Sequence, residues 1–153
     1  MRSLLSESLG STMQAIVLQS FIAVPGADVW SALQARTDIL FDGLPAKAWP
    51  DGGEEQAPFH MTRPWPFTQD AGGATEVSVT LHDMGGGVRV DLRHAGWGEG
   101  PLWDTAIQGH FAGWLQGLAA LGLWLETRTD PRPAGGGARE RAAGLLKSER
   151  YFV

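Results

Sequence analysis

The chain lacks cysteine in all of its 153 residues. A disulfide, a thiolate zinc site and a cysteine nucleophile are therefore excluded. None of the four histidines pairs with another at a metal-ligand spacing, so we predict no metal. The glycine runs at 85–87 and 135–137 lack a phosphate-loop signature, and no Ser-His-Asp arrangement is recognisable. No motif names a reaction, and we predict no cofactor.

Charge is also scarce: charged residues make up 19% of the chain, and the net charge is −5 with no basic stripe. We therefore exclude a nucleic-acid-binding protein, which would carry clustered positive charge. The first eleven residues contain leucines but no continuous apolar run of the signal-peptide type. The most apolar helical stretch, Trp114–Leu125, is too short to cross a bilayer. We expect a cytoplasmic protein without membrane association.

The length fits one domain. We place this domain at residues 12–129, after an N-terminal tail at 1–11. Residues 130–153 begin with the Pro/Gly-rich run DPRPAGGG, and we expect a linker and a C-terminal tail that can pack back on the domain.

The clearest structural pattern is a hairpin of two alternating segments, Thr75–Asp83 and Val88–His94. Strict alternation of apolar and polar residues predicts half-buried antiparallel strands. The glycines of Met84–Gly87 can take positive φ and supply the turn. The apolar face of this hairpin comprises Val77, Val79, Leu81, Val88, Val90, Leu92 and His94.

Weaker patterns predict the elements before the hairpin. Met13–Ile22 is rich in β-formers and predicts a strand, and Pro25 marks the start of a helix with Val29, Trp30 and Leu33 as its buried stripe. A second short helix is expected within Thr37–Trp49, ending before Pro45.

The middle of the chain has room for one or two further strands. Residues 51–58 are polar and turn-like, whereas Phe59–Phe67 alternates like a strand whose prolines, Pro64 and Pro66, confine it to an edge. After the hairpin, a loop precedes a long helix at Trp103–Thr127. The overall prediction is an α+β fold with a shortened sheet.

Two segments resemble a known family. The run EVSVTLHDMGGGVRVDLRHAGWG, followed by GHFAGWLQGLAALGLWLE, is similar to the C-terminal half of the SRPBCC (START-like, helix-grip) superfamily. Its nearest match there is the branch related to the heat-shock-protein-90 ATPase activator homologues. Upstream, PGADVWSAL (Pro25–Leu33) is similar to the family's first helix. The resemblance covers most of residues 13–127 and implies a helix-grip fold, in which an antiparallel sheet of four to six strands wraps a long C-terminal helix.

The long helix carries glycine at every fourth position, at Gly109, Gly113 and Gly117. Each interior glycine costs a helix ~1 kcal/mol relative to alanine, so something must offset this loss. One interpretation is close packing against another helix, the sheet or a partner subunit. The other is that the missing side chains leave room for a bound molecule.

Aromatic and polar residues on the inward faces suggest a pocket. The chain has seven tryptophans, which offer a pocket an apolar face and one N–H donor. His94 continues the apolar hairpin face, His110 borders the inward face of the long helix, and Arg63 shares parity with Trp65. The predicted ligand-binding residues are Arg63, Trp65, Leu92, His94, Trp97, Trp103, Ile107, His110, Phe111 and Trp114.

Each of these residues also has a purely structural interpretation. His94 is either a polar ligand contact, able to act as a base if its pKa stays near neutral, or a hydrogen-bonded core histidine. His110 is alternatively a rim residue and Arg63 a solvent-pointing one, while the tryptophans can simply fill the core.

Three functions are compatible with the sequence. The first, which we favour, is binding of a small hydrophobic molecule between the sheet and the long helix. The second, implied by the resemblance, is a polyketide cyclase-like or isomerase-like enzyme using the same cavity. The third is a co-chaperone-like protein-interaction module. A homodimer is compatible with two surfaces, an exposed sheet edge or the glycine face of the long helix.

Overall fold

The structure is a computed structural model that describes residues 15–50, 53–56 and 59–129. The predicted tail at 1–11 and the predicted linker and tail at 130–153 lie outside these ranges. The elements in chain order are β1 (Ile16–Ile22), α2 (Gly26–Ala35), α3 (Thr37–Leu40), β2 (Glu54–Gln56), β3 (His60–Trp65), the 3₁₀ turn η1 (Gln69–Ala71), β4 (Thr75–Asp83), β5 (Val88–Ala95) and α4 (Pro101–Thr127).

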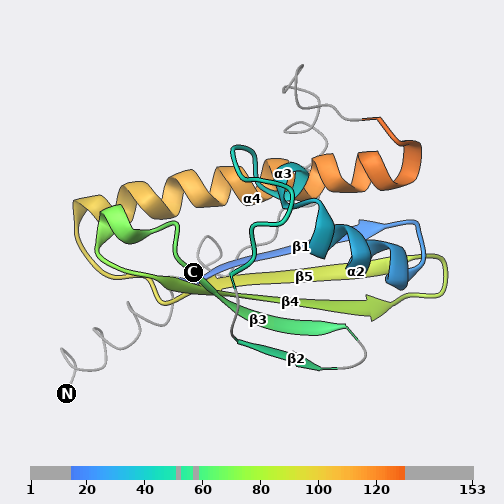
Figure 1. Ribbon diagram of the computed structural model, residues 1–153, viewed down its shortest axis with the longest axis horizontal. Helices are drawn as coiled ribbons and strands as arrows, with labels where there is room; N and C mark the ends of the chain where they lie inside the picture. The colour runs from blue at the N-terminus through green and yellow to red at the C-terminus, as the bar shows by residue number, and fades with distance from the viewer. Residues whose placement is uncertain (1–14, 51–52, 57–58, 130–153) are drawn as a thin grey trace.

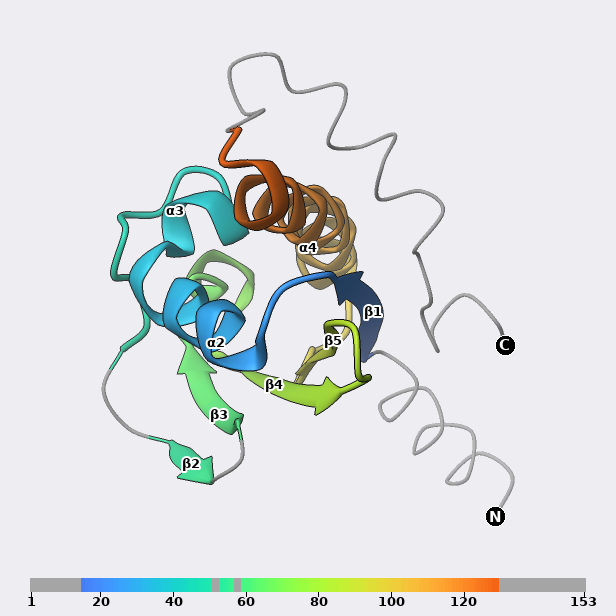
Figure 2. The same ribbon diagram turned by 90° about the vertical axis from the view of Figure 1, so that its right-hand side faces the viewer.

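The five strands form one antiparallel sheet in the order β1-β5-β4-β3-β2. Helix α4 runs across one face of this sheet, and α2 and α3 lie beside α4 on the same face (Figures 1 and 2). The polar residues of the alternating strands lie on the other face of the sheet. This arrangement confirms the predicted α+β helix-grip fold, with a strand number inside the predicted range of four to six.

The hairpin is the most accurate part of the prediction. Strand β4 has the predicted bounds, and β5 runs one residue further, to Ala95. The inward residues of both strands are buried, and His94 is among them with no exposed surface. Alternation succeeds here because one face of each strand packs on the helices while the other stays polar.

The prediction for residues 51–58 was wrong in part. We expected a polar turn, but Glu54–Gln56 forms β2 and pairs with His60–Thr62. A three-residue edge strand depends on backbone hydrogen bonds rather than on side-chain burial, so its polar sequence gives no alternation signal. Pro64 lies beyond this pairing, where β3 has a neighbouring strand on one side only, as expected for an edge proline.

The first helices are also close to their predicted positions. Val29 and Leu33 of α2 are fully buried, whereas Trp30 is only partly buried and stacks on Phe59 with ring centroids 5.5 Å apart. Trp30 therefore sits at the margin of the core rather than within the buried stripe.

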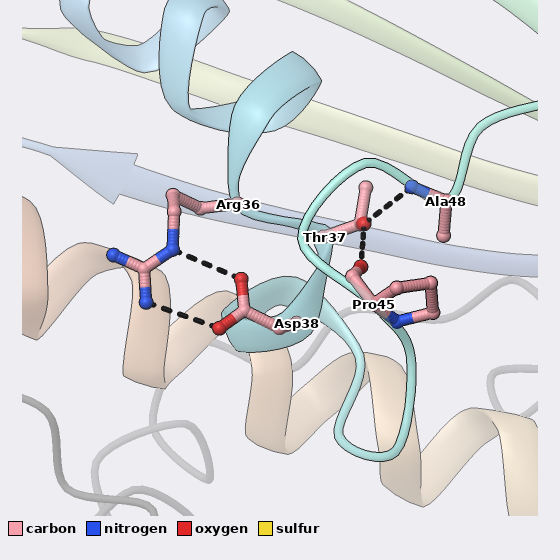
Figure 3. Close-up of polar contacts among 5 residues, drawn as sticks. All are labelled: Arg36, Thr37, Asp38, Pro45 and Ala48. Carbon is pink, nitrogen blue, oxygen red and sulfur yellow. Dashed lines mark hydrogen bonds and ion pairs between the residues drawn. The ribbon is translucent and has the colours of Figure 1, made fainter.

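Helix α3 is held in place by a buried threonine. The Thr37 hydroxyl donates to the carbonyl of Pro45 at 2.5 Å and accepts from the Ala48 amide at 2.9 Å (Figure 3). Next to it, the Arg36 guanidinium forms two hydrogen bonds with the Asp38 carboxylate, at 2.9 and 3.0 Å. These contacts close the loop after α3 and fix the backbone that α4 packs against.

Helix α4 begins at Pro101, two residues before the predicted start, because proline favours the first position of a helix. None of the helices in the described ranges combines the length and apolar content needed to cross a membrane.

Close packing accounts for two of the three glycines in α4. A Cβ at Gly117 would lie 1.6 Å from the backbone oxygen of Leu40, and a Cβ at Gly113 would lie 2.5 Å from the Phe41 ring. The space above these glycines is thus filled by α3 and the residue after it, which excludes the interpretation that it holds a ligand. It also removes this part of the glycine face as a homodimer surface. Gly109 faces open space.

The two kinds of glycine should respond oppositely to alanine. Gly117→Ala forces α4 away from α3, and we expect the free energy of unfolding to fall by about 3 kcal/mol, the upper range for overpacking. Gly109→Ala meets no neighbour and should raise it by about 0.5–1 kcal/mol, the propensity difference alone. Urea melts of both variants measure these changes. Equal responses would contradict the packing of α3 on α4.

Candidate functional site

Two histidines and three tryptophans meet between the sheet and α4. We call this group the histidine cluster; it comprises His94 on β5, His110 and Trp114 on α4, Trp65 at the end of β3, and Trp97 in the loop after β5. The His94 ring lies 5.3 Å from that of His110 and 4.2 Å from that of Trp97, between centroids. The structure therefore brings together five of the ten residues predicted to bind a ligand.

Both ring nitrogens of His94 have partners. The Trp114 indole N–H donates to Nδ1 at 2.9 Å, so in the neutral ring the proton must be on Nε2. Nε2 lies 2.5 Å from Thr75 Oγ1 and donates to it. Thr75 in turn donates to Thr68 Oγ1 at 3.2 Å, because the Thr68 hydroxyl is itself the donor to the Gly73 carbonyl at 2.6 Å. The tautomer of His94 is set by this chain of hydrogen bonds.

His110 has the opposite tautomer. Its Nε2 accepts from the Trp65 indole N–H at 3.0 Å, and its Nδ1 donates to the Ala106 carbonyl at 2.9 Å. A third indole, that of Trp97, donates to the backbone oxygen of His94 at 2.8 Å. The three indole N–H groups of the cluster are thus used within the protein.

Burial keeps both imidazoles neutral. It lowers the pKa of His94 from 6.5 to about 2, with a further contribution from the nearby His110. Burial also lowers the pKa of His110, while the hydrogen bond to Ala106 acts in the opposite direction. His94 can therefore act as a base only if it first gives up the Trp114 hydrogen bond. This geometry matches the hydrogen-bonded core histidine that the sequence left as one alternative.

The other predicted residues have varied surroundings. Leu92 and Ile107 are fully buried in the core, and Phe111 packs partly buried against it. Trp103 packs on Trp97, with ring centroids 6.2 Å apart. Arg63 forms an ion pair with Glu55 of β2, so its guanidinium is directed to the sheet edge rather than left in solvent.

The sequence analysis missed a central member of this region, Phe41. Its ring lies 4.9 Å from Trp114, 5.2 Å from His110 and 5.6 Å from Trp65, between centroids. Phe41 follows a four-residue helix and belongs to no periodic pattern, so sequence alone gave no signal. Phe41 thus packs against three aromatic rings of the histidine cluster.

A cavity lies at the opposite ends of β4 and β5. We call it the hairpin cavity; its volume is about 680 Å³. Its wall is mainly apolar with one carboxylate, and it is formed by Ala23, Val24, Pro25, Gly26, Phe59, Leu81, Asp83, Gly85, Gly86, Gly87 and Val88. These residues come from the start of α2, the β4–β5 turn and the residue before β3. The ten predicted ligand-binding residues are not among them.

One signal for this cavity was present in the sequence. Asp83 has the same parity as Val77, Val79 and Leu81, so it places a carboxylate on the apolar face of β4 at the end of the strand. The role of Phe59 and Gly26 had no such signal, because it depends on how the loops fold against one another. Among the described residues, no group of three or more metal-binding side chains is placed to hold an ion.

Because the pKa of His94 is lowered, its protonation should destabilise the fold. The unfolded chain takes up this proton below pH 6.5 while the native state does not until about pH 2, so stability is lost as the pH falls between these values. Comparing the wild type with His94→Gln, which keeps a donor and an acceptor, isolates this effect. The stability advantage of the wild type should shrink by about 2 kcal/mol between pH 6.5 and pH 4.5. Parallel pH profiles in urea melts would show that His94 titrates normally in the native protein.

No protein-family model and no curated protein matches this chain. Several solved structures match it. CalU16 from Micromonospora echinospora is 20% identical with a TM-score of 0.57, covering 86% of this chain and 85% of that one. The protein encoded by gene BPP1335 from Bordetella parapertussis is 21% identical with a TM-score of 0.55, covering 88% and 87%. DynU16, described as a putative protein in the dynemicin biosynthetic locus, is 16% identical with a TM-score of 0.60, covering 76% of this chain and 49% of that one. At these identities the likeness establishes the fold, and the chain shares the helix-grip architecture of these proteins.

Proposed function

We propose that this protein binds a small, mainly apolar molecule in the hairpin cavity. The observation that carries the proposal is the cavity itself: its volume of about 680 Å³ and its predominantly apolar wall with a single carboxylate. Sites for small molecules typically have volumes of ~300–1,000 Å³ and apolar linings with a few polar groups. The proposed function is the one predicted from the sequence, but the proposed binding site lies at the hairpin end rather than beside the middle of α4.

The surface around this cavity supports the same conclusion. Phe21 and Met84 are large apolar residues that are 45% and 53% exposed, and both belong to the hairpin end of the sheet. Phe21 lies beside Gly87 of the cavity wall, since a Cβ built on Gly87 would be 2.8 Å from the Phe21 ring. Exposed apolar residues at this end of the sheet are of the kind found near binding sites for apolar molecules.

In this proposal the histidine cluster has a supporting role. Its hydrogen bonds and ring contacts tie α4 to the sheet at one end, which leaves the hairpin end to bind the ligand. Direct ligand contact by the predicted residues, His94 above all, is an untested alternative that this proposal does not require. A homodimer through a sheet edge stays a prediction: in the part of the chain that the structure describes, β1 and β2 each pair on one side only.

A cyclase-like or isomerase-like enzyme is the second candidate. It is favoured by the structural likeness to DynU16, a protein of a biosynthetic locus, and by Asp83, an ionisable group in the cavity wall. We further propose, on the sequence resemblance alone, that the chain is related to the branch of the heat-shock-protein-90 ATPase activator homologues. Neither proposal implies a chaperone partner.

Filling the cavity should abolish ligand binding. A Cβ at Gly26 would lie 3.2 Å from the Phe59 ring and 3.3 Å from Val88, so the side chain of Gly26→Leu enters the cavity wall. The matched control is Ala27→Leu, at an exposed neighbouring position of the same helical turn. The probe is N-phenyl-1-naphthylamine, an uncharged dye that fluoresces in apolar surroundings. Wild type and Ala27→Leu should bind one dye per chain and gain melting temperature.

For Gly26→Leu we expect at least tenfold weaker dye binding with a cooperative melt retained. Equal binding by Gly26→Leu and the control would rule out this cavity as the site. Dye binding that appears only on partial unfolding would exclude a ligand-binding function and favour a protein-interaction role.

A further inference from the structure

The hairpin cavity contains a carboxylate on an otherwise apolar sheet face. Asp83 is the last residue of β4 and pairs with Val88, whose side chain is 3% exposed. Along the same face the preceding inward residues are Val77, Val79 and Leu81. Asp83 itself is exposed, so its carboxylate is accessible to a hydrogen-bond donor on a molecule in the cavity.

Forming the turn uses only one of the two oxygens of Asp83. The Gly85 amide donates to Oδ1 at 2.9 Å, a local turn contact that an asparagine side chain would make equally well. The charge and the second oxygen are not required for this contact. Within the described ranges, the salt bridges engage Asp38, Glu55 and Asp91 but not Asp83.

Phe59 provides an aromatic wall for the same cavity. Its backbone has φ of 60°, a left-handed conformation that is unusual for a bulky residue. The conformation is held by a hydrogen bond from the Leu81 amide to the Phe59 carbonyl, at 3.0 Å, and by contact of the ring with Trp30. Strained residues of this kind persist where the surroundings fix them, often at ligand sites.

We propose that the hairpin cavity selects molecules that carry an O–H or N–H donor on a flat apolar body, with the body against Phe59 and the donor on the Asp83 carboxylate. This inference rests on the proposed function and adds the chemistry of the ligand. The same carboxylate disfavours an anionic ligand, because the two like charges would repel each other. The preferred class is therefore neutral or cationic.

The experiment compares three naphthalenes that differ in one substituent: 2-naphthol, 2-methoxynaphthalene and 2-naphthoate. Titration calorimetry near neutral pH gives their affinities for the wild type, Asp83→Asn and Phe59→Leu. Asp83→Asn retains the acceptor for the Gly85 amide, so the turn is preserved while the charge is removed. Gly26→Leu serves as the variant with a filled cavity.

The wild type should bind 2-naphthol about tenfold more tightly than 2-methoxynaphthalene, although the methyl ether is the more hydrophobic of the two. Asp83→Asn should reduce this ratio to about twofold and should raise the affinity for 2-naphthoate about fivefold. A merely structural role for Asp83 would lower all three affinities together. Phe59→Leu should weaken 2-naphthol and its ether equally, about threefold, leaving their ratio unchanged.

The outcomes separate this inference from the proposed function. If all three compounds bind the wild type equally, or if Asp83→Asn leaves the ratio unchanged, the inference is overturned; loss of that binding in Gly26→Leu would still support the cavity as a ligand site. If no naphthalene binds the wild type, or if binding persists in Gly26→Leu, the proposed function fails with it.

Discussion

The contact on which this structure depends is the hydrogen bond between the indole of Trp114 and the imidazole of His94. It joins the middle of α4 to the end of β5, and both side chains are fully buried. A buried donor without its acceptor would cost ~1–3 kcal/mol, so helix and strand are fixed in one register. The chain from His94 through Thr75 and Thr68 extends this constraint to the start of β4. The position of α4 on the sheet follows from it.

The consequence is a molecule with two different ends. At one end, aromatic side chains from α4, the sheet and Phe41 pack against one another. The glycines of α4 let α3 approach closely there. At the other end, α2 begins at Gly26 and the glycine-rich β4–β5 turn supplies little side-chain volume, so the hairpin cavity remains. The rigid end holds the secondary structure in place, and the hollow end has the volume and apolar wall of a ligand site.

Much of the fold could be predicted from the sequence because its signals are local. Alternation in Thr75–Asp83 gave β4 its bounds, and the apolar stripe of α4 gave the long helix to within two residues. Strand β2 was missed because backbone pairing rather than side-chain burial forms it. Five of the predicted site residues do meet, but alternation cannot distinguish a filled core from a cavity. That difference depends on Phe41, which lies outside any periodic segment, and on Phe59, which was predicted to begin a strand but lies just before β3 and contacts Trp30.

The central claim is that a ligand enters the hairpin end and leaves the histidine cluster untouched. Proton–nitrogen NMR spectra recorded with and without N-phenyl-1-naphthylamine test it directly, since the two ends carry separate reporters. We predict chemical-shift changes at the amides of Gly26, Gly85 and Gly87, with the indole signals of Trp97 and Trp114 unmoved. Shifts of the indole signals with unchanged glycine amides would contradict the account and place the ligand between the sheet and the middle of α4.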